Sequence, residues 1–266
     1  MTYRGVETLR SVNRILAEDT RRTSILLRHY GINTPLISAH EHNEMARAGQ
    51  IVAWLRDGED LAIVSDAGTP LLSDPGARIV RAVLDAGFDV VPIPGASALL
   101  AALVAAGIEP EPFTFFGFLP RSGKERKTRL VELAGLTHTV LLYEAPGRVA
   151  KLLAELVETC GADRQAVVAR ELTKLHETFV RGTLQELASY YEDEAVRGEV
   201  VVVLAGAQPA SGEAVSASAA ETAQELLRAG NSPRDVAREI TRRFNLPRNL
   251  AYELAQSAQK GSKTAE

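Results

Sequence analysis

Short uncharged runs of aliphatic residues are the feature that most constrains the fold of this 266-residue chain. The runs at 61–65 (LAIVS), 139–143 (TVLLY) and 200–204 (VVVVL) show no alternation between apolar and polar positions. A strand of that composition is covered on both faces, whereas a strand with one solvated face alternates. Because amphipathic helical stretches separate the runs, the sequence predicts a layered α/β architecture.

Composition narrows the class of protein further. Hydrophobic residues make up 45% and charged residues 24%, which is typical of a folded globular chain. The formal net charge of −4 provides no overall positive field, so any contact with nucleic acid depends on local patches. The lone Cys160 excludes a disulfide framework and indicates a reducing compartment.

Two segments bear on targeting and membrane insertion. The residues from Met1 to Arg10 carry charges and no apolar stretch, so we expect no signal peptide and a cytoplasmic location. The uncharged stretch 90–108 contains Pro92, Pro94 and Gly95. These residues predict a buried strand at 89–93 followed by a helix at 96–106, and no membrane span.

Changes in composition predict the domain organisation. A second series of strands and helices begins at Phe113, and small polar residues follow Gln208 as in a linker. Helices are expected at 221–228, 233–244 and 249–259, with the residue before Pro233 as an N-cap. We expect an N-terminal α/β domain at 1–110, a second α/β domain at 111–207, a linker at 208–217, a C-terminal helical domain at 218–259 and a tail at 260–266.

Two bends rich in glycine and proline are candidate ligand sites. The first, at 65–76, follows a predicted strand, where open α/β sheets bind ligands. The second, at 94–98, leads into a helix whose first backbone amides are free to donate. The first bend is alternatively an ordinary connection. The second is alternatively a nucleophile elbow with Ser97, although its fifth position is Ala98 and not glycine.

Charged residues gather at strand ends and in two basic patches. We expect Glu144 to lie close to the charged residues of 170–177, because neighbouring strands end together; the alternative is a surface salt-bridge network. The basic patches favour phosphate contacts over a merely solvated face. His40 and His42 lack nearby ligand companions, so we expect no metal site. The basic residues are Arg121, Lys124, Arg126, Lys127 and Arg129 in one patch, and Arg234, Arg238 and Arg242 in the other.

Six segments in a fixed order give the sequence a family resemblance. It resembles the tetrapyrrole-methylase-like superfamily, and within it the RsmI family of ribosomal RNA methyltransferases. The resemblance extends from about Val6 through the C-terminal helices. The segments are AEDTRRTSILLRHYGI (17–32), SDAGTPLLSDPG (65–76), PGASALLAAL (94–103), FFGFLPR (115–121), LLYEAPGR (141–148) and ARELTKLHETFVRGTL (169–184).

The resemblance implies both a fold and a reaction. It implies two α/β domains with a ligand cleft between them, a small C-terminal helical domain, and a homodimer. It implies S-adenosylmethionine (SAM) as methyl donor and 2′-O-methylation of a cytidine in the decoding centre of 16S rRNA, so the small ribosomal subunit is the expected partner. By the same resemblance, the SAM-binding residues are Gly68, Thr69, Leu72, Ser97, Ala98 and Glu144, and the residues facing the acceptor are Arg170, Glu171, Lys174 and Glu177.

One part of the family pattern does not occur in this sequence. The family opens with an apolar strand and a Thr-Pro-Ile-Gly-Asn-type loop before the helix that matches 6–13. We therefore expect an unpaired sheet edge in the N-terminal domain and a missing wall of the donor pocket. Either the start codon is misassigned or the chain is functionally impaired, and we expect the former.

The chemistry of methyl transfer suggests roles for the polar segment. A ribose hydroxyl is a poor nucleophile, so a carboxylate should accept its proton as the new bond forms. Our hypothesis is that Glu171 or Glu177 is that base, while Arg170 and Lys174 hold phosphate or polarise the hydroxyl. Three other functions stay open: methylation of a small tetrapyrrole-like molecule, ester hydrolysis by Ser97 with His176, and RNA binding without catalysis.

Overall fold

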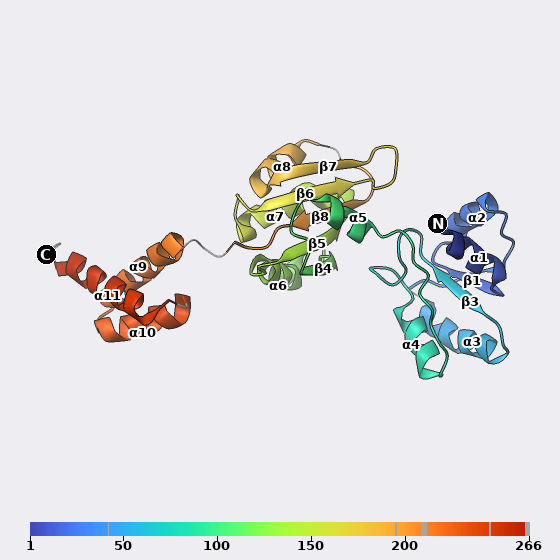
Figure 1. Ribbon diagram of the computed structural model, residues 1–266, viewed down its shortest axis with the longest axis horizontal. Helices are drawn as coiled ribbons and strands as arrows, with labels where there is room; N and C mark the ends of the chain where they lie inside the picture. Colours follow the sequence, from blue (N-terminus) through green and yellow to red (C-terminus); the bar gives the residue numbers. More distant parts are fainter. Residues whose placement is uncertain (42, 195, 209–211, 245, 264–266) are drawn as a thin grey trace. The chain divides into compact units, whose positions relative to one another are not determined.

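The computed structural model describes residues 1–41, 43–194, 196–208, 212–244 and 246–263 (Figure 1). Its internal contacts divide the chain into two units, Met1–Ala207 and Gln208–Glu266. The first unit contains both β-sheets, and the second is helical. Within the described ranges, every helix is too short or too polar to cross a membrane.

The first sheet is parallel and covered on both faces. Its strands are β1 (Arg14–Ala17), β2 (Leu36–Ser38) and β3 (Leu61–Val64), in the order β2-β1-β3. Ile15 packs with α1 (Tyr3–Ser11) and α2 (Thr20–His29), whereas Leu16 packs with α3 (Glu44–Arg56) and α4 (Ala77–Asp85). Consecutive residues thus face opposite helical layers, as the lack of alternation in the sequence predicts.

The strand predicted at 89–93 does not form. These residues pair with no strand in the described part of the chain, and the side chains of Val90 and Val91 are 43% and 63% exposed. The local sequence has strand character, but a strand requires a neighbour whose backbone groups it can pair with. Among the described residues, β2 and β3 are the two edge strands of this sheet.

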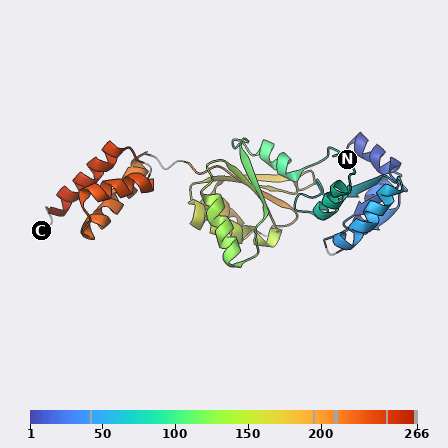
Figure 2. The same cartoon turned by 90° about the horizontal axis from the view of Figure 1, so that it is seen from below.

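The second sheet is mixed and lies between two helical layers. Its order is β4 (Phe113–Phe118), β5 (Thr139–Glu144), β8 (Val200–Leu204), β6 (Gln165–Arg170), β7 (Thr178–Thr183), with only β4 and β5 parallel. Figure 2 shows α5 (Ala98–Ala105) on one face, opposite α6 (Gly123–Ala134). α7 (Val149–Cys160), after the 3-10 turn Pro146–Arg148, and α8 (Leu184–Glu192) share the face of α6.

Helix α5 connects the two predicted α/β domains. The prediction places it within 1–110, but Leu99, Ala102 and Leu103 pack against Leu141 and Val203 of the second sheet. The two predicted domains therefore share an element, and the second bend is attached to the second sheet.

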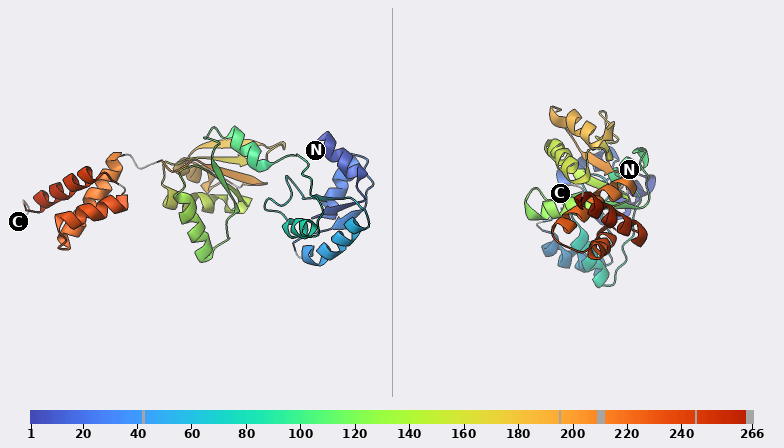
Figure 3. Two further views of the ribbon diagram at one scale, coloured as in Figure 1. Left: turned by 60° about the horizontal axis from the view of Figure 1, so that its bottom comes forward. Right: turned by 90° about the vertical axis from the view of Figure 1, so that its left-hand side faces the viewer.

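The C-terminal unit is a bundle of three helices around an alanine-rich core (Figure 3). The helices are α9 (Gly212–Arg228), α10 (Pro233–Phe244) and α11 (Arg248–Lys263). Ser232 caps α10, since its hydroxyl accepts from the Asp235 amide at 3.3 Å. α9 begins inside the predicted linker 208–217, and α11 extends into the predicted tail 260–266. In α9, alanine, the best helix former, outweighs the small polar residues.

Candidate functional site

The two predicted bends meet in the structure. The hydroxyl of Thr69 in the first bend donates a hydrogen bond of 3.1 Å to the backbone oxygen of Ala96 in the second. The hydroxyl of Thr2, which caps α1, donates to the backbone oxygen of Pro94 at 3.1 Å. Gly68, Thr69, Gly95 and Ala96 are exposed, so side chains of the protein do not fill the space beside them.

The backbone of the first bend explains its glycines. Gly68 has φ +73°, and a Cβ added there would meet nothing within 4 Å. Gly76 has φ +119°, and a Cβ would come within 2.6 Å of the Ile63 side chain, while its amide donates to buried Glu44 at 2.9 Å. Leu71 and Ser73 also adopt positive φ, a strained state that concentrates at functional sites. Gly76 therefore fixes the bend, and Gly68 faces open space.

Ser97 is a helix cap and not a nucleophile in this structure. Its hydroxyl accepts from the Leu100 amide at 3.4 Å and begins α5. No hydrogen bond among the described residues joins it to His176, which is exposed on the loop after β6. The serine-hydrolase alternative requires that pair, so the geometry disfavours it.

An acidic group lies beside the bends, and sequence reasoning missed its leading member, Asp74. Burial raises the pKa of Asp74; a hydrogen bond from Ser65 opposes this, and the carboxylates of Glu18, Asp66 and Glu199 raise it further. A carboxyl with a raised pKa accepts protons more readily near neutral pH. The sequence feature that could have identified it is its position before Pro75 inside the glycine-rich bend.

Tyr143, on strand β5 of the second sheet, lies near Asp74. Its ring lies edge-on to Phe115, with ring centroids 4.8 Å apart, and the backbone N–H of Leu99 donates a hydrogen bond to its hydroxyl oxygen. Burial raises the pKa of Tyr143, and the nearby charges of Asp74 and Glu199 raise it further. A protonated phenol beside a carboxylate can donate a hydrogen bond to a bound ligand.

Glu144, predicted to bind SAM, is instead part of a buried ion network. Its side chain is fully buried; its carboxylate accepts from the Ala145 amide at 2.8 Å and contacts Arg148 at 2.5 Å and Arg126 at 3.8 Å. Leu142 and Glu144 face the α6–α7 layer, whereas Leu141 and Tyr143 face α5. Because successive strand residues point to opposite faces, Tyr143 and not Glu144 faces α5.

Arg126, predicted to bind RNA, is buried in the same network. It is 2% exposed and donates to the Pro120 oxygen at 2.8 Å and to Glu155 at 2.6 Å. RNA contact would require this side chain to leave three partners. The structure therefore removes Arg126 from the first basic patch, whose other members are exposed.

The charged segment 170–177 forms most of its polar contacts within itself and with Glu199. Glu171, at φ +52°, accepts from Lys174 at 2.8 Å and from the Glu199 amide at 3.1 Å, and these bonds lower its pKa. Glu177 accepts from the Thr173 amide at 2.5 Å. Arg170 and Glu144 both pair with Val200, so these strand ends are neighbours as predicted. Arg170 donates to Thr178 at 3.3 Å.

The remaining basic residues differ in whether they form ion pairs. Arg121, Lys124 and Lys127 form no ion pair with another described residue, whereas Arg129 pairs with Glu132 at 2.9 Å. On α10, Arg238 and Arg242 pair with Asp235 and Glu239, and Arg234 is exposed. His42 lies outside the described residues, among which no three His, Cys, Asp or Glu side chains gather as metal ligands.

Comparison with known proteins places this geometry in a family. Residues 1–188 match the family model of Tetrapyrrole (Corrin/Porphyrin) Methylases. Ribosomal RNA small subunit methyltransferase I of Bacillus subtilis (strain 168) is 48% identical over 206 residues, covering 77% of this chain and 70% of the relative. The protein of the same name from Pseudomonas aeruginosa is 43% identical over 228 residues, covering 85% and 81%.

Solved structures share the fold at lower identity. A cobalt precorrin-4 methyltransferase of cobalamin biosynthesis is 18% identical with a TM-score of 0.58, covering 77% of this chain and 88% of that one. A Thermus thermophilus uroporphyrin-III C-methyltransferase complexed with S-adenosyl homocysteine is 17% identical with a TM-score of 0.55, covering 77% and 90%. The chain therefore belongs to the tetrapyrrole (corrin/porphyrin) methylase family, in the group of the ribosomal RNA small subunit methyltransferases I.

Proposed function

We propose that this protein transfers a methyl group from SAM to the ribose 2′-hydroxyl of a cytidine in the RNA of the small ribosomal subunit. The observation that carries the proposal is the contact between the two bends through Thr69 and Ala96. The relatives at 43–48% identity named for ribosomal RNA support the substrate class, whereas the tetrapyrrole methyltransferases share only 17–18%.

The residues at the bends fit the donor. Gly68 leaves open space where a side chain would stand, and the first amides of α5, beside Ser97 and Ala98, are available to a polar ligand. Thr69 and Leu72 are exposed at the same bend. When bound, SAM supplies an electrophilic methyl group on a positively charged sulfur. The acidic group of Asp74, Asp66 and Glu18 suits that charge.

The chain's own residues then orient the acceptor and remove its proton. Asp74 accepts the proton of the attacking hydroxyl as the new carbon–oxygen bond forms and the bond between the methyl carbon and the sulfur of the donor breaks. Tyr143 donates a hydrogen bond that positions the ribose, and exposed Lys174 and Arg121 attract phosphate. The resemblance also implies a homodimer, and the exposed Leu100 and Val104 of α5 offer an apolar surface for it.

The direct test measures methyl transfer from labelled SAM to small ribosomal subunits and to naked small-subunit RNA. We expect incorporation at one cytidine ribose, detected as resistance of that linkage to alkaline cleavage. Uroporphyrinogen III serves as the competing acceptor. Transfer to the tetrapyrrole alone, or no saturable binding of SAM in calorimetry, contradicts the proposal.

Replacing Asp74 with asparagine is expected to lower the rate of methyl transfer by about two to four orders of magnitude while SAM still binds. The base works only when deprotonated, so the wild-type rate should fall as pH drops through the raised pKa of Asp74. That fall should occur at a higher pH than for an ordinary aspartate. A rate and pH profile unchanged in the variant contradict this role.

The segment 170–177 gives a second, independent expectation. Alanine at Lys174 should lower methyl transfer about tenfold or more, because phosphate loses a positive contact, with SAM affinity unchanged. Alanine at Arg170, Glu171 and Glu177 completes the set, measured for transfer and SAM binding separately. Full turnover in all four variants removes this segment from the reaction.

A further inference from the structure

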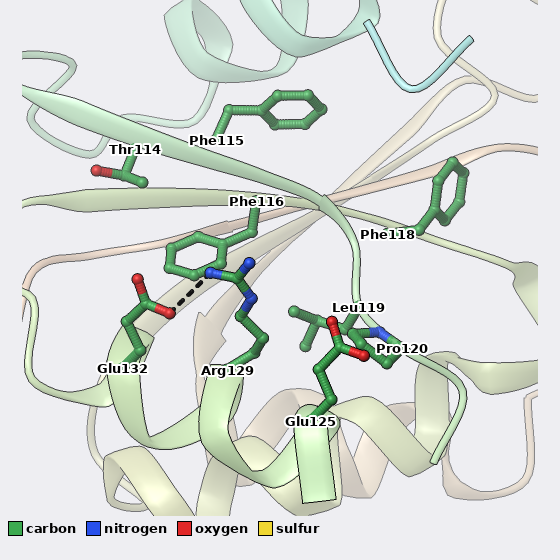
Figure 4. A pocket seen from close by; sticks show the side chains of 9 residues that line it. All are labelled: Thr114, Phe115, Phe116, Phe118, Leu119, Pro120, Glu125, Arg129 and Glu132. Carbon is green, nitrogen blue, oxygen red and sulfur yellow. Dashed lines mark hydrogen bonds and ion pairs between the residues drawn. The ribbon is translucent and has the colours of Figure 1, made fainter. Parts of the chain in front are cut away.

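A pocket of about 300 Å³ lies between the edge strand β4 and helix α6 (Figure 4). Phe116, Leu119 and Pro120 form its strand side. Glu125, Arg129 and Glu132 form its helix side, and their spacing of four and three residues places them on one face of α6. The pocket therefore combines an aromatic surface with three charged side chains.

The three charged side chains of the pocket differ in whether they have a partner. Arg129 is held by Glu132 at 2.9 Å, as the dashed line in Figure 4 shows. Glu125 forms no hydrogen bond or ion pair with another described residue, so its carboxylate is an open acceptor. Phe116 packs against the buried core of the second sheet, which fixes its ring at the pocket. Figure 4 shows Phe115 pointing to the other side of the strand.

These features select the chemistry of the ligand. Two carboxylates against one guanidinium repel a phosphate or a carboxylate group. An aromatic ring and a guanidinium are the surfaces on which proteins stack unstacked RNA bases. The volume is at the small end of ligand pockets and accommodates one base. An ionised carboxylate only accepts hydrogen bonds, and guanine alone presents two adjacent N–H donors on its Watson–Crick edge.

The surroundings supply the backbone contacts that such a base needs. Arg121 immediately follows Pro120, and Lys124 immediately precedes Glu125; both are exposed and unpaired within the described residues. Lys127 lies one turn further along α6. Positive side chains hold phosphates without reading sequence, whereas the pocket contacts the base.

We propose that this pocket binds an unstacked guanine of the RNA substrate, at a nucleotide other than the one methylated, with Glu125 accepting from its N1–H and N2–H groups. The inference rests on the proposed function, because that function supplies the RNA. In this proposal, two lysines of α6, Lys124 and Lys127, contact phosphates, and Glu125 on the same helix selects the base.

The test uses nine-residue oligouridines with guanosine, inosine or uridine at the centre, bound to the full chain and followed by fluorescence anisotropy. The guanosine oligonucleotide should bind about tenfold more tightly than the uridine one. Inosine, which lacks the 2-amino group, should lose most of that difference. Glu125→Gln should remove the preference, and the exposed position of Glu125 keeps the variant folded. Lys127→Gln, the matched control, should weaken all three equally.

The outcomes separate this inference from the proposed function. Equal binding of the guanosine and uridine oligonucleotides, or a preference that survives Glu125→Gln, overturns the pocket even if methyl transfer to small-subunit RNA is normal. A guanosine preference that depends on Glu125, found with no methyl transfer to that RNA, supports the pocket and contradicts the proposed function. Absence of binding to all three oligonucleotides also counts against the pocket.

Discussion

Replacing Gly68 with leucine is expected to weaken binding of SAM by about a hundredfold or more and to abolish methyl transfer. The position at φ +73° faces open space beside Thr69, and a branched side chain would occupy the volume assigned to the donor. Displacement of about 1 Å at a reacting centre already costs about a hundredfold in rate. Isothermal calorimetry with SAM measures the effect directly.

Gly31 provides the matched control. It is also exposed, has φ +61°, and a Cβ there would meet nothing within 4 Å, but it follows α2, away from the bends. Leucine at either position incurs a similar backbone strain of about 1–2 kcal/mol. Gly31→Leu should therefore bind SAM as the wild type does. Equal affinity in both variants would place the donor elsewhere.

Removing the buried carboxylate of Glu144 is expected to lower the free energy of unfolding by about 3–5 kcal/mol. The Glu144→Ala change leaves Arg126, only 2% exposed, without one of its two acidic partners and Arg148 without its 2.5 Å contact. A buried charge that loses its partner retains its desolvation cost without the compensating attraction. Urea unfolding followed by circular dichroism measures the loss.

Glu132→Ala is the comparison for that measurement. Glu132 also pairs with an arginine, at 2.9 Å, but both side chains are about half exposed. Exposed pairs contribute about 0–1 kcal/mol, so this variant should unfold nearly as the wild type does. If the two alanine variants lose the same stability, the buried network is not a structural element. Glu144 would then become available again as a binding residue.

The bends could be predicted from sequence because their geometry is encoded locally. Glycine at Gly68 and Gly76 permits positive φ, and the prolines fix the chain direction, so the residues themselves indicate the turns. The contact between Thr69 and Ala96 forms although the strand predicted before the second bend does not, so the expectation of neighbouring strand ends does not explain it. The uncharged strands likewise predicted two covered sheet faces.

The features that the sequence did not reveal depend on contacts between distant segments. In the segment Tyr143-Glu144, both strand faces are buried, so the sequence lacks the alternation that would show which side chain faces α5. The residues at 89–93 have strand character but no pairing partner. Arg126 looks like its exposed basic neighbours, and only its position beside Glu144 and Glu155 shows that it is buried.

The attachment of α5 to the second sheet has a mechanical consequence. The first bend is anchored to the first sheet through Gly76 and Glu44, whereas Ser97 begins a helix held by Leu141 and Val203. The two bends of the proposed donor site are thus held by different sheets, and the stretch 86–97 that joins them contains no helix or strand. Any change in the spacing of the two bends would change the proposed donor site, so donor binding and that spacing are thermodynamically linked.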